Sequence, residues 1–272
     1  MSWMLLASAS GFFAGVACAV VGVFVITMHL SFLGVCIAHA AFAGALMAVW
    51  LGFDPLFGAL AFSLGAAAAI GPLADRGEIN PDTSTGIVFS LMLGLAFLFL
   101  GLTPGSRTEA LGLFWGSILT VTPRDAAILA ASAAAIVALL LLFFKEIQAV
   151  LCHRHIALAV GIPATLVFYG MLFATGLTIA VSLRCIGGLL IYSLILNPAA
   201  AAFQLTYRLK RMFILAAAFG VASCWAGLAA SYFWDLPAGA SIVITSSLLF
   251  AAATAFSPKR KVKACPPLNT VS

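Results

Sequence analysis

Few side chains in the apolar stretches of this sequence could carry chemistry, and His39 is the clearest of them. It follows Phe32 by seven positions in an uncharged run, which corresponds to roughly 10 Å along a helix axis. An ionisable side chain at that depth in a bilayer is a functional candidate by default. Cys36 precedes His39 by three positions, so we expect both side chains on one helix face. Thiolate and imidazole together suit Zn²⁺ and other late transition metals better than Mg²⁺ or Ca²⁺.

Two interpretations of this pair stay open. In a two-fold dimer, two such helices would present four ligands to one ion. Alternatively, His39 bonds to a carbonyl of a neighbouring helix and Cys36 packs as a small apolar residue. The other histidines are weaker candidates: His29 is expected at the interface, at the end of the first helical hairpin. His153 and His155 are two positions apart, which turns them away from each other on a helix and predicts surface residues at a docking site.

Motifs for nucleotide or peptide hydrolysis are absent from the sequence. No GxxxxGK[ST] phosphate loop occurs, so any ATP-driven work is expected on another subunit. No HExxH or GxSxG motif occurs either, which argues against an intramembrane hydrolase. We therefore expect no catalytic residue and no bound cofactor in this chain.

The composition places these residues in a membrane. Of 272 residues, 64% are hydrophobic and 8% are charged, whereas soluble domains carry about 25% charged residues. The first charged side chain is Asp54, which leaves room for two crossings before it at roughly 20 residues each. We predict an all-α polytopic membrane protein with about eight to nine transmembrane helices, the first at residues 1–27 rather than a cleaved signal peptide. Uncharged stretches at 55–74, 83–106, 126–144, 156–183, 185–207, 212–234 and 236–258 supply the others.

Loop charges predict the orientation. If the loops near residues 145–154 and 207–211 and the segment 259–263 are cytoplasmic, helix alternation also places residues 75–82 inside, so ten Lys and Arg lie inside and three outside. The positive-inside rule then gives an external N-terminus and a cytoplasmic C-terminus in the cell (inner) membrane. We expect a membrane domain over residues 1–257 and a disordered basic tail over 258–272. The net charge of +5 follows from the loops, so we expect no nucleic-acid partner.

Two segments depart from regular spanning helices. Residues 109–122 are apolar but too short to cross, which predicts a re-entrant or interfacial helix on the outer side. The stretch from Arg184 to residue 207 contains the pairs Gly187-Gly188 and Asn197-Pro198, each of which predicts an interruption of the helix. Discontinuous helices of this kind often lie beside a transport path.

Six segments of the sequence are distinctive when taken in order. They are LSFLG with AHA (30–34, 38–40), DTSTGIVFS (82–90), WGSIL (115–119), AVGIP (159–163), VSLRCIGGLL with NPAAA (181–190, 197–201) and DLPAG (235–239). Together they resemble the permease family of the zinc, manganese and iron ATP-binding-cassette importers, and the resemblance runs from about residue 11 to residue 256, nearly the whole chain.

The resemblance implies a set of partners. A permease of this family pairs with a second permease copy, in a homo- or heterodimer, within the lipid bilayer. Two cytoplasmic ATP-binding subunits dock on it, and an extracytoplasmic metal-binding protein delivers the ion. The segment that couples ATP hydrolysis to transport would run from Ile147 to Gly161 and include Leu151, His153, Arg154 and His155.

The sequence also departs from the family pattern. The family usually has an acidic residue four positions before the histidine, where this chain has Val35. The usual basic pair before the signature is replaced by Met28-His29, and the usual acidic residues of the coupling segment are missing. Loss of a carboxylate removes a hard, Mn²⁺-favouring ligand and leaves the identity of the transported metal open.

The leading hypothesis is a permease subunit that imports a divalent transition metal by alternating access. An ion-coupled secondary transporter is the first alternative, although it would need intramembrane carboxylates that the predicted helices lack. A membrane scaffold with a vestigial metal site is the second, and Val35 in place of an acidic residue favours it slightly.

Overall fold

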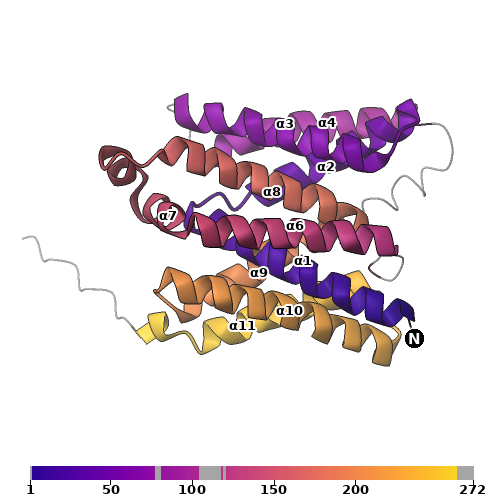
Figure 1. The fold of residues 1–272 in the computed structure, drawn as a ribbon. Helices are drawn as coiled ribbons and strands as arrows, with labels where there is room; N and C mark the ends of the chain where they lie inside the picture. Colours follow the sequence, from indigo (N-terminus) through magenta and orange to yellow (C-terminus); the bar gives the residue numbers. More distant parts are fainter. Residues whose placement is uncertain (1, 77–80, 104–117, 119–120, 262–272) are drawn as a thin grey trace, which may run out of the picture.

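The computed structural model describes residues 2–76, 81–103, 118 and 121–261 of the chain. Within these residues the chain forms ten α-helices and one 3₁₀ helix, and no strand (Figure 1). The helices are α1 (Ser2–Thr27), α2 (Leu33–Leu51), α3 (Pro55–Arg76), α4 (Pro81–Leu102), α6 (Pro123–Leu142), α7 (Phe144–Ala159), α8 (Ala164–Ile186), α9 (Gly188–Leu205), α10 (Leu209–Trp234), α11 (Ala238–Ala255) and η2 (Pro258–Lys261).

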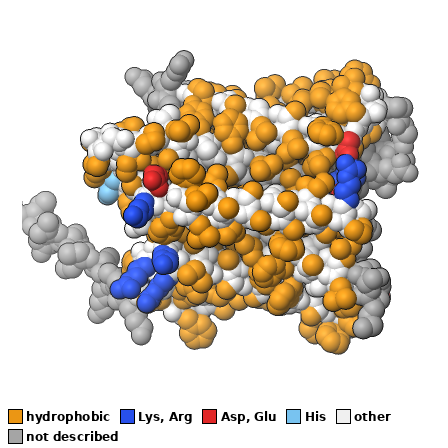
Figure 2. All heavy atoms as spheres, in the orientation of Figure 1, with side chains coloured by type: hydrophobic (Ala, Val, Ile, Leu, Met, Phe, Trp, Pro, Cys, Tyr) orange, Lys and Arg blue, Asp and Glu red, His pale blue; other side chains and the backbone are white. Residues whose placement is uncertain are grey.

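Eight of these helices are long and apolar enough to cross a bilayer, and α9 adds a shorter apolar helix. This confirms the all-α membrane fold and the expected eight to nine spans. The helices lie side by side with their ends gathered at two faces of the bundle (Figure 1). Lysine and arginine side chains cluster at these two ends, and hydrophobic side chains cover the sides between them (Figure 2). A bilayer accepts this distribution because only the ends meet water.

The two ends differ in their charged groups. We call one the ion-pair end, because Asp54, Asp125 and Arg184 meet there where α2 and α8 end and α3 and α6 begin. We call the other the basic end, where α6, α9 and α11 end and α7, α10 and η2 begin. The basic end carries Lys145, Arg154, Arg208, Lys210, Arg211 and Lys259.

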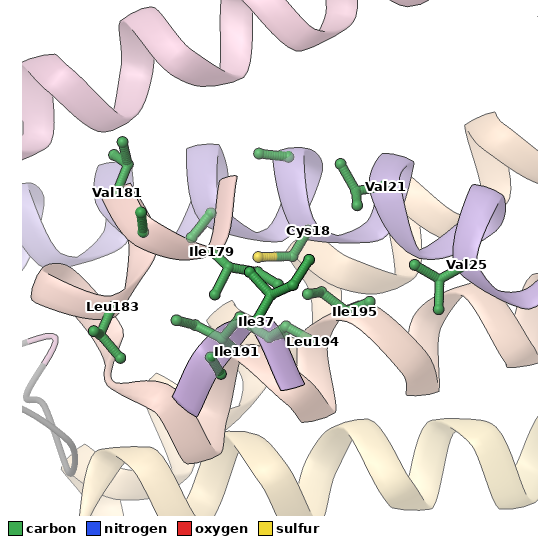
Figure 3. Packing of buried hydrophobic residues seen from close by; sticks show 14 of the residues in the cluster. Cys18, Val21, Val25, Ile37, Ile179, Val181, Leu183, Ile191, Leu194 and Ile195 are labelled. Carbon is green, nitrogen blue, oxygen red and sulfur yellow. The ribbon is translucent and has the colours of Figure 1, made fainter. Parts of the chain in front are cut away.

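The core forms where α1, α2, α8 and α9 converge. Figure 3 shows Cys18, Ile37, Ile179, Ile191 and Ile195 pointing toward one another from these four helices. In α1 and α2, 72% of the spanning residues are buried, whereas in α4 only 17% are. α4 therefore lies at the margin of the bundle, and α1 and α2 hold its centre.

Glycines allow α9 and α10 to approach α1 closely. A Cβ built on Gly15 would lie 2.8 Å from the backbone of Gly220 in α10. A Cβ on Gly22 would lie 1.9 Å from the carbonyl oxygen of Ile195 in α9. Real Cβ atoms do not tolerate such distances, so the small residues set the crossing of α1 with both helices.

Capping residues end and begin the helices at two of the junctions between them. Gly52 ends α2 with a φ of +80°, and the Asp54 carboxylate then accepts the N–H of Leu56 at the start of α3. At the start of α6, Thr122 and Asp125 form a capping box, followed by Pro123 in the first turn. Such caps satisfy N–H groups that have no partner within the helix.

The segment that follows Arg184 is interrupted once, not twice. Gly187, with φ +83° and ψ +155°, separates α8 from α9, as predicted. The second predicted interruption, at Asn197-Pro198, is wrong, because α9 continues through both residues. Proline costs the helix one N–H donor, but the Asn197 side chain bonds to α11 and holds this part of α9 against its neighbour.

Two other expectations fall largely on residues that the structure does not describe. The predicted interfacial helix at 109–122 lies outside the described residues except for Ile118, Val121 and Thr122, and Thr122 caps α6. Of the predicted tail, Pro258–Lys261 forms η2 and the remainder lies outside them. Lys259 places its ammonium over the rings of Phe203 and Tyr207, which ties η2 to the end of α9.

Candidate functional site

A groove of about 390 Å³ opens between α2, α9 and α11. It brings together His39, Gly188 and Asn197, which the sequence placed in separate motifs. Most of the lining is apolar, and the polar groups come chiefly from α9 and α11. The lining residues are Val35, Ala38, His39, Gly188, Tyr192, Ser193, Asn197, Val243 and Ser247.

His39 is held in one orientation. Its Nδ1 lies 2.9 Å from the carbonyl oxygen of Val35, one turn earlier in α2. A carbonyl oxygen can only accept, so Nδ1 carries the proton and the lone pair of the neutral imidazole lies on Nε2. The ring of Phe89 from α4 meets the imidazole edge to face, with 5.0 Å between centroids. Metal-binding histidines are typically oriented by such a bond from the other ring nitrogen.

Cys36 lies elsewhere. Its side chain is fully buried in the hydrophobic core, and it is not among the residues that line the groove. Over the part of the chain that the structure describes, no three His, Cys, Asp or Glu side chains lie together as a metal site would need. One copy of the chain therefore offers His39 to the groove without a ready-made cluster around it, and metal binding by Cys36 stays a prediction.

The polar side of the groove is a hydrogen-bonded cluster between α9 and α11. Asn197 Nδ2 lies 3.0 Å from each of the hydroxyls of Ser193, Ser246 and Ser247. The Ser193 and Ser246 hydroxyls are 2.7 Å apart. Sequence reasoning found Asn197 but missed the serines and Tyr192, although α9 and α11 both carry polar residues at helical spacing, a signal that could have found them.

Arg184 is not part of this groove. Its Nη1 donates to Asp54 Oδ1 at 2.9 Å and its Nε to Asp125 Oδ1 at 3.1 Å, at the ion-pair end. Gly187 follows it at the α8–α9 junction. The two carboxylates were not predicted as its partners, although each lies at a helix start, where such residues commonly gather.

The segment predicted to couple with ATPases lies at the basic end. Ile147 and Leu151 are buried, whereas His153 is exposed and has non-helical dihedral angles (φ −157°, ψ +97°), so it kinks α7. The Arg154 guanidinium lies 4.6 Å from the centroid of the Phe168 ring in α8, and Gly161 has a φ of +86°. The side chain of His155 lies outside the described residues.

An exposed apolar surface accompanies that kink. The exposed fractions are 59% for Ile156, 47% for Leu158 and 73% for Val160. A second groove of about 290 Å³ runs between the two halves of α7 and is lined by Cys152, His153 and neighbouring apolar residues. Exposed apolar side chains next to a row of cations are typical of a surface that contacts another protein.

Comparison with known proteins gives a consistent picture. Residues 1–257 match the family described as the ABC 3 transport family. The chain is 30% identical over 261 residues to the manganese transport system membrane protein MntC of Halalkalibacterium halodurans, covering 96% of this chain and 89% of that one. It is 26% identical to the chelated iron transport system membrane protein YfeD of Yersinia pestis, covering 92% and 84% of the two chains.

Solved structures agree. PsaBC from Streptococcus pneumoniae, determined in complex with Fab, is similar with a TM-score of 0.85 and 29% identity, covering 96% of this chain and 94% of that one. A metal-chelate type ABC transporter in an inward-facing conformation matches with a TM-score of 0.72 and 13% identity, covering 92% of this chain and 85% of that one. The second likeness concerns the fold alone.

Proposed function

Because this chain belongs to the ABC 3 transport family, we propose that it is the permease subunit of an ATP-driven importer of a divalent transition-metal ion. The observation that carries this proposal is the groove between α2, α9 and α11, in which an oriented imidazole faces a polar cluster. Relatives named for manganese and for chelated iron support this substrate class.

The basic end is proposed to face the cytoplasm. It carries six described Lys and Arg side chains, whereas the ion-pair end carries Arg124 and Arg184. By the positive-inside rule, the C-terminus would then be cytoplasmic and the N-terminus external. The cell membrane is the expected location, since eight of the described helices are long and apolar enough to cross it.

In each permease copy, the segment from Ile147 to Gly161 is proposed to bind one ATP-binding subunit, so that two such subunits dock on the dimer. Its exposed Ile156 and Val160 supply the apolar contact, and the kink at His153 separates the exposed half from the half packed on the bundle. Movement of the ATPases would reach α8 through Arg154 and Phe168. An external metal-binding protein would deliver the ion at the ion-pair end.

His39 is proposed as a ligand of the transported ion. A single imidazole binds a metal weakly, so a second permease copy would bring its own His39 to the same ion and give it a second nitrogen ligand. Cys36 is the alternative ligand, and it would have to leave the core to reach the groove. Since Val35 replaces the family's acidic residue, late transition metals such as Zn²⁺ are favoured over Mn²⁺.

Reconstitution with the partner ATPase in proteoliposomes tests the proposal. We expect metal to accumulate inside only when ATP and the ATPase are both present. His39→Ala should lower uptake at least about tenfold, because losing even a group that only orients a metal ligand typically costs that much. Cys36→Ser should lower uptake only if the thiol is a ligand. Uptake by the lone chain driven by a proton gradient would contradict the proposal, and unchanged uptake by His39→Ala would exclude the ligand role.

A further inference from the structure

The cluster of Asn197 with three serines has a fixed direction of hydrogen bonding. The Ser246 hydroxyl lies 2.8 Å and the Ser247 hydroxyl 2.9 Å from the carbonyl oxygen of Val243. A carbonyl oxygen cannot donate, so each serine uses its one proton in that bond. Toward Asn197, both hydroxyls can therefore only accept.

This direction determines which atoms of the Asn197 carboxamide face the serines. An amide nitrogen donates two protons, whereas the amide oxygen only accepts. Hydroxyls that only accept must face the nitrogen, as the 3.0 Å distances from Nδ2 to Ser246 and Ser247 require. Ser193 then donates to Ser246 at 2.7 Å and lies 3.0 Å from Asn197 Nδ2, so the two protons of that nitrogen are shared among three accepting hydroxyls.

The amide oxygen is the remaining polar atom of Asn197, a residue that lines the same groove as His39. A planar carboxamide whose nitrogen is bonded to the serines points its oxygen away from them. Amide oxygens are metal ligands in many proteins, and bonds to the other end of the ligand group commonly fix its orientation. The groove thus offers an imidazole nitrogen from α2 and an amide oxygen from α9.

We infer that the Asn197 side-chain oxygen is a second ligand of the transported metal, in the groove that contains His39. This inference rests on the proposed function. Among the residues that line the groove, α2 contributes Val35, Ala38 and His39 but no carboxylate, and Asn197 supplies a neutral oxygen from α9. An imidazole nitrogen and an amide oxygen are both neutral ligands and lack the negative charge that attracts hard ions. The site should therefore prefer Zn²⁺ to Mn²⁺.

Metal binding by the purified complex tests the assignment. Asn197→Leu removes the oxygen, and we expect the Kd for Zn²⁺ to rise about tenfold or more, the effect of losing a ligand or its support. Asn197→Asp places a carboxylate at the same position and should shift the ratio of Mn²⁺ to Zn²⁺ affinity toward Mn²⁺. Asn197→Ser keeps a hydroxyl for the serine cluster without an amide oxygen, so it should also weaken Zn²⁺ binding if Asn197→Leu fails to fold.

Thr254→Val is the matched control, because that hydroxyl bonds only within α11, to the carbonyl oxygen of Phe250. It should bind Zn²⁺ as the unaltered chain does. Folded Asn197→Leu and Asn197→Ser complexes with unchanged Zn²⁺ affinity and an unchanged Mn²⁺ to Zn²⁺ ratio would overturn the inference and leave the permease function standing. An unaltered complex that neither binds nor transports metal would instead overturn the proposed function.

Discussion

The two ends of α8 are held by different forces. At the ion-pair end, Arg184 bonds to Asp54 and Asp125, which joins α8 to the starts of α3 and α6. At the basic end, the junction of α7 and α8 is held by a small apolar cluster of Val150, Ala157 and Ala164, with the Arg154 guanidinium over Phe168. Directional ion pairs fix relative positions, whereas a few small apolar contacts allow an element to shift.

The contrast suggests how motion is divided in the molecule. The groove lies between α2, α9 and α11, and α9 begins at Gly188, four positions after the ion-paired Arg184, so one wall of the groove starts beside the fixed end of the bundle. The kinked α7 presents exposed apolar side chains at the other end, where a partner could move it. Three substitutions test this contrast.

Loss of the arginine should have the largest effect. Arg184→Ala leaves the Asp125 carboxylate, which is 9% exposed, without its cationic partner. Breaking a buried pair costs about 3–5 kcal/mol and an exposed pair about 0–1 kcal/mol. Since Arg184 is 38% exposed, we expect an intermediate loss of about 2 kcal/mol in the free energy of unfolding. In thermal unfolding of the detergent-solubilised protein this corresponds to a Tm lower by about 4–8 °C.

Arg124→Ala is the control for that measurement, because Arg124 is exposed and directly precedes Asp125. It should leave the Tm near that of the unaltered chain. Arg184→Lys keeps the charge but has one nitrogen for two carboxylates, so its Tm should fall by about half as much as that of Arg184→Ala. Equal Tm values for Arg184→Ala and Arg124→Ala would show that the ion pairs do not fasten this end.

A charge on the exposed face of α7 should have a smaller effect on stability and a clear one on association. Ile156 is 59% exposed, so Ile156→Asp should leave the Tm unchanged. If this face contacts the ATPase, a desolvated carboxylate there weakens binding by about 1.4 kcal/mol, or about tenfold in Kd. Surface plasmon resonance with the immobilised permease measures that Kd.

Phe256→Asp is the matched control, since Phe256 is 84% exposed at the same end but lies outside the proposed coupling segment. We expect it to bind the ATPase as the unaltered chain does. Equal weakening by both substitutions would mean that charge anywhere at the basic end disturbs docking and that α7 has no special part in it.

Much of the fold could be predicted from the sequence because the bilayer requires long apolar helices. The spans follow from the uncharged runs, and the junction of α8 and α9 follows from the Gly187-Gly188 pair, which interrupts a helix. The interruption expected at Asn197-Pro198 was wrong. The prediction considered only the N–H donor that proline lacks, and not the contacts that keep the helix in place. Side-chain bonds from Asn197 to α11, which hold α9 there, depend on tertiary contacts that a single segment does not reveal.

The site was predicted less completely than the fold. His39 could be found because an ionisable residue is rare inside an apolar helix. The pairing of His39 with Cys36 relied on helical spacing alone, whereas in the structure Cys36 lies in the core and His39 in the groove. The partners of Arg184, far away in sequence, and the serines of α11 could not be assigned without knowing which helices are neighbours.

The smallest expected effect concerns the junction of α7 and α8. Gly161 has a φ of +86°, and a Cβ there would meet no atom within 4 Å, so Gly161→Ala introduces backbone strain without a clash. An L-residue in that region costs about 1 kcal/mol. Gly170→Ala, in α8 with equally open surroundings, should instead stabilise by about 0.5–1 kcal/mol, because alanine favours a helix. Opposite shifts in Tm from two identical chemical changes would show that the junction depends on one backbone conformation. If Gly161→Ala raises the Tm as Gly170→Ala does, the junction does not depend on a positive φ at residue 161, and the basic end of α8 adapts to changes in backbone conformation.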